Sequence, residues 1–159
     1  TSDVSIESEL QKIEEKAAAM QEDLSSGELT QQEMNTLSLQ LYQLWDNELN
    51  SIWSRLKETL NEDTMTTLTQ EERDWIKTKD SAVEEAGKDA EGGSLQPLLE
   101  NDKAAELTRD RVYELADIFQ NLYLLQFQTF QIILLNYNRG CNKLSAYSQP
   151  LTSQIFLDG

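Results

Sequence analysis

Carboxylates are the most abundant chemically active groups in this chain, and histidine is absent. Asp and Glu number 29 against 13 Lys and Arg, with no His and one Cys. Paired carboxylates on facing helices are typical of di-iron sites, but those sites also require a Glu-x-x-His motif. A Ser-His-Asp triad, a Cys-His pair and an imidazole pH switch are excluded for the same reason. We therefore expect no catalytic, cofactor-binding or metal-binding residues.

The loop-like motifs do not indicate a calcium-binding or phosphate-binding site. The spacing from Asn61 to Glu72 resembles the start and end of a calcium loop. However, Thr66 stands where the turn glycine belongs, and Met65 cannot ligate calcium. We interpret this stretch as a solvated loop, and Gly92-Gly93 as a turn, not a phosphate-binding loop.

Tryptophans and one acidic cluster are the candidates for partner binding. Core packing is the first interpretation of Trp45, Trp53 and Trp75, and anchoring of a partner is the alternative. The acidic cluster predicts either a solvated face or a docking patch for a basic protein. Its members are Glu84, Glu85, Asp89 and Glu91.

The net charge of -16 restricts the classes of partner. This field repels phosphate backbones and anionic lipid head groups, so nucleic acids and membrane surfaces are not expected partners. The longest apolar stretch, residues 119–137, is interrupted by six Gln and Asn residues, which makes it too polar for the bilayer core. We expect no membrane span in this chain.

Apolar residues recur at steps of three and four, which predicts an all-α bundle of about four principal helices, two of them long. The first helix ends at Gly27. The second opens with a capping box at Thr30 and Glu33 and runs for about thirty residues. A similar box predicts that the third begins at Thr69 and Glu72.

The fourth helix is expected to start after a Ser94 cap, with Pro97 in its first turn. Apolar spacing carries it to about Asn138, where Gly140 would close it. The helices together predict a core, whose members are Ile13, Leu37, Leu41, Leu44, Leu49, Ile52, Leu56, Trp75, Leu107, Val112 and Leu115.

A break in composition follows residue 118. Residues 1–118 hold 28 acids and 11 bases, a net of -17, whereas residues 119–159 hold one acid and two bases. We therefore expect an N-terminal helix at 1–29, a helical domain at 30–118, and a helix extension with a low-charge tail at 119–159. The tail from Ser145 should be irregular, and Cys141, which has no partner for an internal disulfide, should be an inert thiol.

Four groups of residues follow one another in a familiar order. The first resembles the pattern Y-x3-D-x2-L-N-x2-[YW]-x2-L of the lysozyme inhibitor LprI-like family. Its residues are Tyr42, Asp46, Leu49, Asn50, Trp53 and Leu56. The second is similar to the family's L-x6-W-I-x2-[RK]-D block and comprises Leu68, Trp75, Ile76, Lys79 and Asp80.

The third and fourth groups complete the resemblance, which covers about residues 34–118. They match the family's G-[GS]-S turn and its closing L-T-x2-R-x3-L block. Their residues are Gly92, Gly93, Ser94, Leu107, Thr108, Arg111 and Leu115.

The resemblance implies an all-helical, exported domain, commonly a lipoprotein or periplasmic protein, in a family named after a member that inhibits lysozyme. Relatives typically carry cysteines that can form disulfides, one of them where Val83 stands here. The chain starts Thr-Ser-Asp without Met, so we expect a processed product whose leader, with any lipid anchor, is not shown. Among the motif residues, Asp46, Asn50, Asp80 and Arg111 are interpreted as a structural polar network between helices.

Two hypotheses about function follow. In the first, the chain is a non-enzymatic binding domain whose anionic surface meets a basic lysozyme and occludes its sugar-binding cleft. In the second, it is a structural or scaffolding envelope protein that contacts a partner through its long helices. Binding to lysozyme separates the two.

Overall fold

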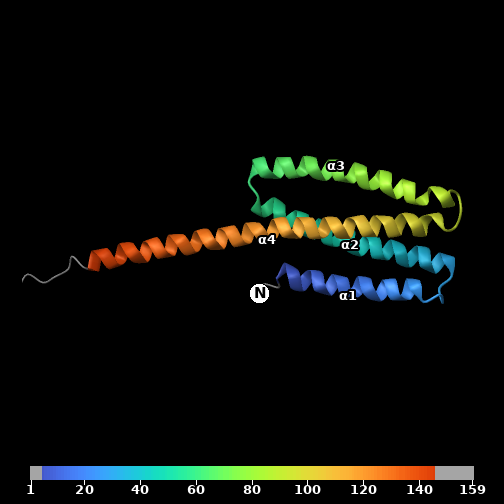
Figure 1. Cartoon of the computed structure of the whole chain (residues 1–159), viewed down its shortest axis with the longest axis horizontal. Coiled ribbons are helices and arrows are strands. Elements are labelled where there is room, and N and C mark those ends of the chain that lie inside the picture. Colours follow the sequence, from blue (N-terminus) through green and yellow to red (C-terminus); the bar gives the residue numbers. More distant parts are fainter. Residues whose placement is uncertain (1–4, 146–159) are drawn as a thin grey trace, which may run out of the picture. The chain divides into compact units, whose positions relative to one another are not determined.

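Helices make up nearly all of the described chain. The structure, a computed structural model, describes the backbone of residues 5–145 and the side chains of residues 5–137 except 123 and 126. The elements are α1 (Ile6–Ser25), α2 (Gln31–Thr59), α3 (Glu62–Gly87), the 3-10 turn η1 (Lys88–Ala90) and α4 (Gln96–Ser145) (Figure 1). The all-α, four-helix prediction is confirmed, and the tail predicted to be irregular lies outside the described residues from 146 onward.

The chain divides into two units, Thr1–Gln120 and Asn121–Gly159, and α4 contributes to both. In the first unit each helix runs antiparallel to the one before it (Figure 1). Polar contacts join the helices pairwise: Arg55 on α2 reaches Glu9 on α1, and Asn101 on α4 reaches Ser38 on α2. The unit is therefore a four-helix bundle of alternating direction.

The start of α2 confirms the predicted capping box. Thr30 Oγ1 accepts from the Glu33 backbone N–H at 3.3 Å, and Glu33 Oε2 accepts from the Thr30 N–H at 2.8 Å. Gly27 lies between α1 and α2 with φ +76°, in the left-handed region that glycine adopts without strain. The sequence signals for this connection are thus seen in the structure.

The predicted start of α3 is wrong. The helix begins at Glu62, and Asn61 caps it by accepting from the Thr64 N–H at 2.9 Å. Thr69 is a mid-helix residue whose hydroxyl donates to the Met65 carbonyl at 2.7 Å. Asn is as good a cap as Thr, and here it comes first, directly after α2 ends. The interpretation of residues 61–72 as a solvated loop is therefore also wrong, because α3 covers residues 62–72.

The bounds of α4 also differ from the prediction. The helix begins at Gln96, so Leu95 and not the predicted Ser94 precedes it, and Pro97 falls in the first turn as expected. At the other end, α4 continues through Gly140 to Ser145. A glycine inside a helix costs only about 1 kcal/mol relative to alanine, which does not by itself end a helix.

The core lies along one face of α2 and the facing side of α4. Of the predicted core residues, six are buried: Leu41, Leu49, Ile52, Leu56, Val112 and Leu115. The other five are half-buried: Ile13, Leu37, Leu44, Trp75 and Leu107. Trp45, for which core packing was the first interpretation, is 1% exposed, whereas its neighbour Leu44 is half-buried.

Two substitutions on α2 test this placement. Ile52→Ala should lower the free energy of unfolding by about 2–5 kcal/mol, because the side chain is fully buried and its removal leaves a cavity. Leu44→Ala should cost less than half as much, since solvent already reaches this side chain. Urea unfolding followed by circular dichroism measures both, and equal costs would contradict the burial described.

Candidate functional site

Residues of the first and second family motifs lie together in a groove between α2 and α3. The groove has a volume of about 340 Å³. Its lining includes Asp46, Asn50 and Trp53 from α2, and Trp75 and Lys79 from α3. The motif spacing therefore marks one surface feature of the bundle, which we call the motif groove.

The α2 wall of the motif groove is held by contacts within the helix. Asn50 Nδ2 donates to the Asp46 carbonyl at 2.7 Å and to Asp46 Oδ2 at 3.2 Å. Leu49 turns inward and is buried, whereas Trp53 is half-buried on the groove side. This wall therefore combines an aromatic ring, a carboxylate and an amide.

On the α3 wall, a lysine lies among aromatic rings. Lys79 Nζ is 5.4 Å from the ring centre of Tyr42 and 5.3 Å from that of Trp75, and it donates to the Tyr42 hydroxyl at 3.3 Å. Such cation–π contacts are worth about 0.5–1 kcal/mol where solvent reaches them. Lys79 thus ties α3 to α2 at this end of the groove.

Behind the groove, Arg111 on α4 forms a buried ion pair with Glu72 on α3. Arg111 Nε lies 2.8 Å from Glu72 Oε2, and the two side chains are 11% and 9% exposed. Arg111 Nη1 also donates a hydrogen bond to Glu114 Oε2 at 2.6 Å, and the guanidinium lies over the Trp75 ring. Burial pushes the pKa of Arg111 down, but its hydrogen bonds to Glu114 and Glu72 raise it overall.

The predicted polar network is seen only at Arg111. Its buried partner is Glu72, which was predicted to form a capping box with Thr69 and not to belong to the polar network. Asp46 and Asn50 pair with each other within α2, and Asp80 is exposed. A buried arginine needs a carboxylate, and that requirement was the available signal for Glu72.

The Gly-Gly-Ser motif lies outside the groove, in the turn between η1 and α4. Gly92 has φ +72°, and a side chain there would be strained. The Ser94 carbonyl accepts from Asn35 Nδ2 at 2.9 Å, which ties the turn to α2. A structural role in reversing the chain follows for Gly92 and Ser94.

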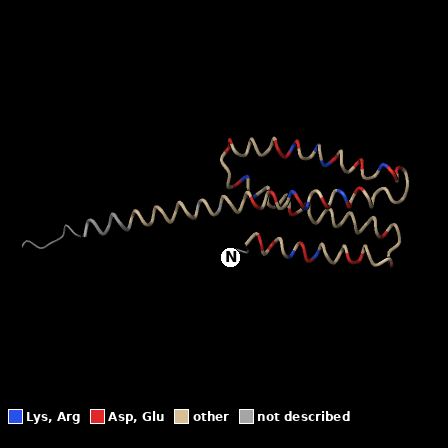
Figure 2. The backbone as a smooth tube through the Cα atoms, in the orientation of Figure 1, with Lys and Arg blue, Asp and Glu red and all other residues tan. Residues whose placement is uncertain are grey.

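The acidic cluster, predicted as either a solvated face or a docking patch, lies at the end of α3, in η1 and directly after η1. Glu84, Glu85, Asp89 and Glu91 are all exposed. Glu85 pairs with Lys88, and this hydrogen bond raises the pKa of Lys88. Figure 2 shows acidic residues on every helix of the bundle, with fewer basic ones between them.

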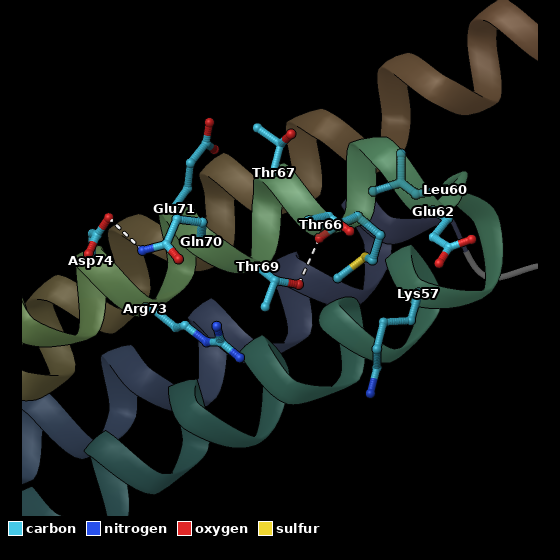
Figure 3. A pocket seen from close by; sticks show the side chains of 11 residues that line it. Lys57, Leu60, Glu62, Thr66, Thr67, Thr69, Gln70, Glu71, Arg73 and Asp74 are labelled. Carbon is cyan, nitrogen blue, oxygen red and sulfur yellow. Dashed lines mark hydrogen bonds between the residues drawn. The ribbon is translucent and has the colours of Figure 1, made fainter.

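A hollow of about 970 Å³ lies near the connection from α2 to α3 (Figure 3). Lys57 and Arg73 supply its positive charge, and Gln70 donates to Asp74 at 3.1 Å on its rim. Within the described residues, no three acidic or cysteine side chains are grouped closely enough to hold a metal ion. The hollow is lined mainly by polar side chains of α3, and it shares Thr69 and Arg73 with the motif groove.

A second buried carboxylate, Glu48, faces α1. It is 6% exposed, and its Oε1 has no hydrogen-bond partner among the described residues. Burial raises the pKa of Glu48, and the nearby charge of Glu9 raises it further, while Arg55 lowers it. This carboxylate therefore works against the folded state when it is ionised.

Comparison with known proteins places the chain in a family. A model of the family described as lysozyme inhibitor LprI matches residues 22–115, more than half of the chain, so the chain belongs to this family. The family resemblance inferred from the motifs is confirmed, and the match begins earlier, in α1.

The individual relatives add little about function. An uncharacterised protein of Rhizobium meliloti (strain 1021) is 41% identical over 54 residues, which are 34% of this chain and 39% of that protein. The chain thus matches well under half the length of this curated relative. No solved structure matches. None of the described helices combines the length and apolar character needed to cross a membrane.

Removal of one partner of the buried ion pair should be costly. Arg111→Met leaves Glu72 buried without its cation and should lower the free energy of unfolding by about 3–5 kcal/mol. The double variant Glu72→Leu, Arg111→Met should recover most of this loss, because neither charge remains. Urea unfolding at pH 7 measures all three proteins, and a double variant as unstable as the single one would contradict a pairing role.

Glu48 should make stability fall as the pH rises. Its folded-state pKa is above the ordinary 4.5, so the folded state holds the proton more tightly and stability declines as pH rises from about 4.5 through the folded pKa. Glu48→Gln has no such group, so its advantage over the wild type should grow across this window. Unfolding measured from pH 4 to 7 tests this, and a constant difference would contradict it.

Proposed function

We propose that this domain is an exported, non-catalytic inhibitor that binds a basic lysozyme and covers its sugar-binding cleft. The observation that carries the proposal is the family match over residues 22–115, which lies within the four-helix unit. Bacteria-lysing lysozymes are generally basic, so charge supports the same partner. The domain would have to be exported to meet such an enzyme, because lysozymes act on the cell wall.

The charge balance of the bundle favours a basic partner. Residues 1–118 carry 28 acids and 11 bases. Six of those bases already pair with acids of the same chain, at Arg55, Lys77, Lys88, Lys103, Arg109 and Arg111. The uncompensated acids remain on the surface, where they would steer a basic protein toward the domain and raise the association rate.

Charge alone gives little specificity, so the complex also needs an anchor. The motif groove offers one at Trp53, which is half-buried beside the Asp46 carboxylate. Tryptophans in such settings often dominate binding energy, because they combine a large apolar surface with a fixed shape. We propose that a side chain of the partner enters this groove and slows dissociation.

The scaffolding alternative has its own support in the length of α2, which spans 29 residues, and of α4. A scaffold would contact its partner along these helices and would leave lysozyme unaffected. Lysozyme binding therefore remains the discriminating observation.

The acidic cluster should control the rate of association. Replacement of Glu84, Glu85 and Glu91 by Gln and of Asp89 by Asn should slow association with a basic lysozyme by up to about tenfold and change dissociation little. The effect should shrink as salt rises, because exposed charges are screened over about 8 Å at physiological ionic strength. Surface plasmon resonance at several salt concentrations measures both rates.

Two controls make this result specific. A matched variant neutralises four exposed acids at the opposite end of the bundle, with Gln at Glu58, Glu62 and Glu71 and Asn at Asp117. It has the same net charge and should bind faster than the cluster variant. Cytochrome c, a basic protein of similar size, should bind weakly. Equal binding of cytochrome c, or equal slowing in both variants, would contradict a specific acidic docking patch.

A further inference from the structure

The second half of α4 exposes an unusual amount of apolar surface. Residues 118–138 contain no Asp, Glu, Lys or Arg. Between residues 124 and 137, nine large apolar side chains are each 40–69% exposed. Monomeric soluble proteins rarely expose a contiguous apolar patch of this kind unless something binds it.

Part of this surface has the spacing of a helix-pairing seam. Phe127, Phe130, Leu134 and Tyr137 follow one another at steps of three, four and three, so they lie along one stripe of the helix. Their exposed fractions are 55%, 57%, 40% and 69%. Alternation of three and four is the repeat by which two helices pack side by side.

We propose that a second copy of this chain covers the stripe, and that the two α4 segments pack antiparallel. A second copy presents the same stripe, so one surface complements itself about a two-fold axis. The segment offers no charge with which to select a basic protein. The acidic bundle, in turn, repels an anionic membrane.

The charge of the preceding residues sets the orientation. Residues 1–118 of each copy carry a net charge of -17 and are joined to the same end of the segment. Parallel pairing would bring both acidic bundles to one end. Antiparallel pairing attaches them at opposite ends of a segment about 30 Å long, well beyond the screening length of about 8 Å.

The area available is sufficient for a modest dimer. A buried aromatic side chain covers about 150–250 Å², so half-exposed rings offer on the order of 100 Å² each. Four seam residues with their flanking neighbours give on the order of 500 Å² per copy and 1,000 Å² in total. This total reaches the lower limit for specific interfaces.

Light scattering on the full chain tests the association. The wild type should have twice the 18.2 kDa mass of one chain. The seam variant Phe130→Gln, Leu134→Gln should raise the dimer dissociation constant about 100-fold or more and appear as a monomer. Circular dichroism should show the helical content of the bundle retained in both.

The matched control is Leu124→Gln, Leu135→Gln. It removes two exposed apolar side chains of the same helix, about a third of a turn away from the seam. This variant should remain dimeric. A monomeric wild type, or the same mass for both variants, would overturn the proposal. A monomer that co-sediments with phosphatidylcholine vesicles would also overturn it and would assign the stripe to a lipid surface.

Spin labels test the orientation. Asn121 is exposed, and a label on Asn121→Cys in a Cys141→Ser background marks one end of the segment. In an antiparallel pair centred between Phe130 and Leu134, the two labels should be about 30 Å apart along the axis. Labels lying side by side would overturn the antiparallel arrangement.

Discussion

Burial of one face of α2 is the constraint on which the rest of the bundle depends. Leu41, Trp45, Ile52 and Leu56 are all nearly inaccessible to solvent, and the single cysteine leaves no internal disulfide to support them. Packing must therefore hold the fold by itself. When this face of α2 points into the core, the helical repeat places Asp46, Asn50 and Trp53 on the side of α2 that faces α3. The motif groove is therefore a consequence of how the core is packed.

The acidic character of the chain is divided between the inside and the outside of the bundle. Inside, both Glu48 and Glu72 have an Oε1 without a hydrogen-bond partner among the described residues. Glu72 is offset by its ion pair with Arg111, whereas burial raises the pKa of Glu48 and its ionised form weakens the folded state. Outside, the acids outnumber the bases. Ion pairs with lysine and arginine neutralise some of these acids, but a net negative charge remains. An inhibitor of a basic enzyme would use the outer charge for encounter and the groove for holding its partner, while the buried pair would fix the geometry between them.

The sequence predicted the architecture well where local signals agree with packing. The capping box at Thr30, the glycine turns and the apolar stripes gave four helices and much of the core. The start of α3 was wrong because Asn61 competes with Thr69 on equal terms, and only the end of α2 decides between them. Glu72 was assigned to a helix cap, and its pairing with Arg111 was missed, because an exposed acid and a buried acid look alike in sequence. Burial is a property of three-dimensional packing, and for the same reason Leu44, predicted to be in the core, is only half-buried beside the fully buried Trp45.

The most direct test of the central claim is the rate at which a basic lysozyme lyses bacterial cell walls as this domain is titrated into the assay. We expect the rate to fall to a low plateau and the fall to shift to higher domain concentration as salt rises. Cytochrome c at the same concentrations should have no such effect. An unchanged rate at a large excess of folded domain would contradict the claim, because a protein that covers the cleft must exclude the substrate.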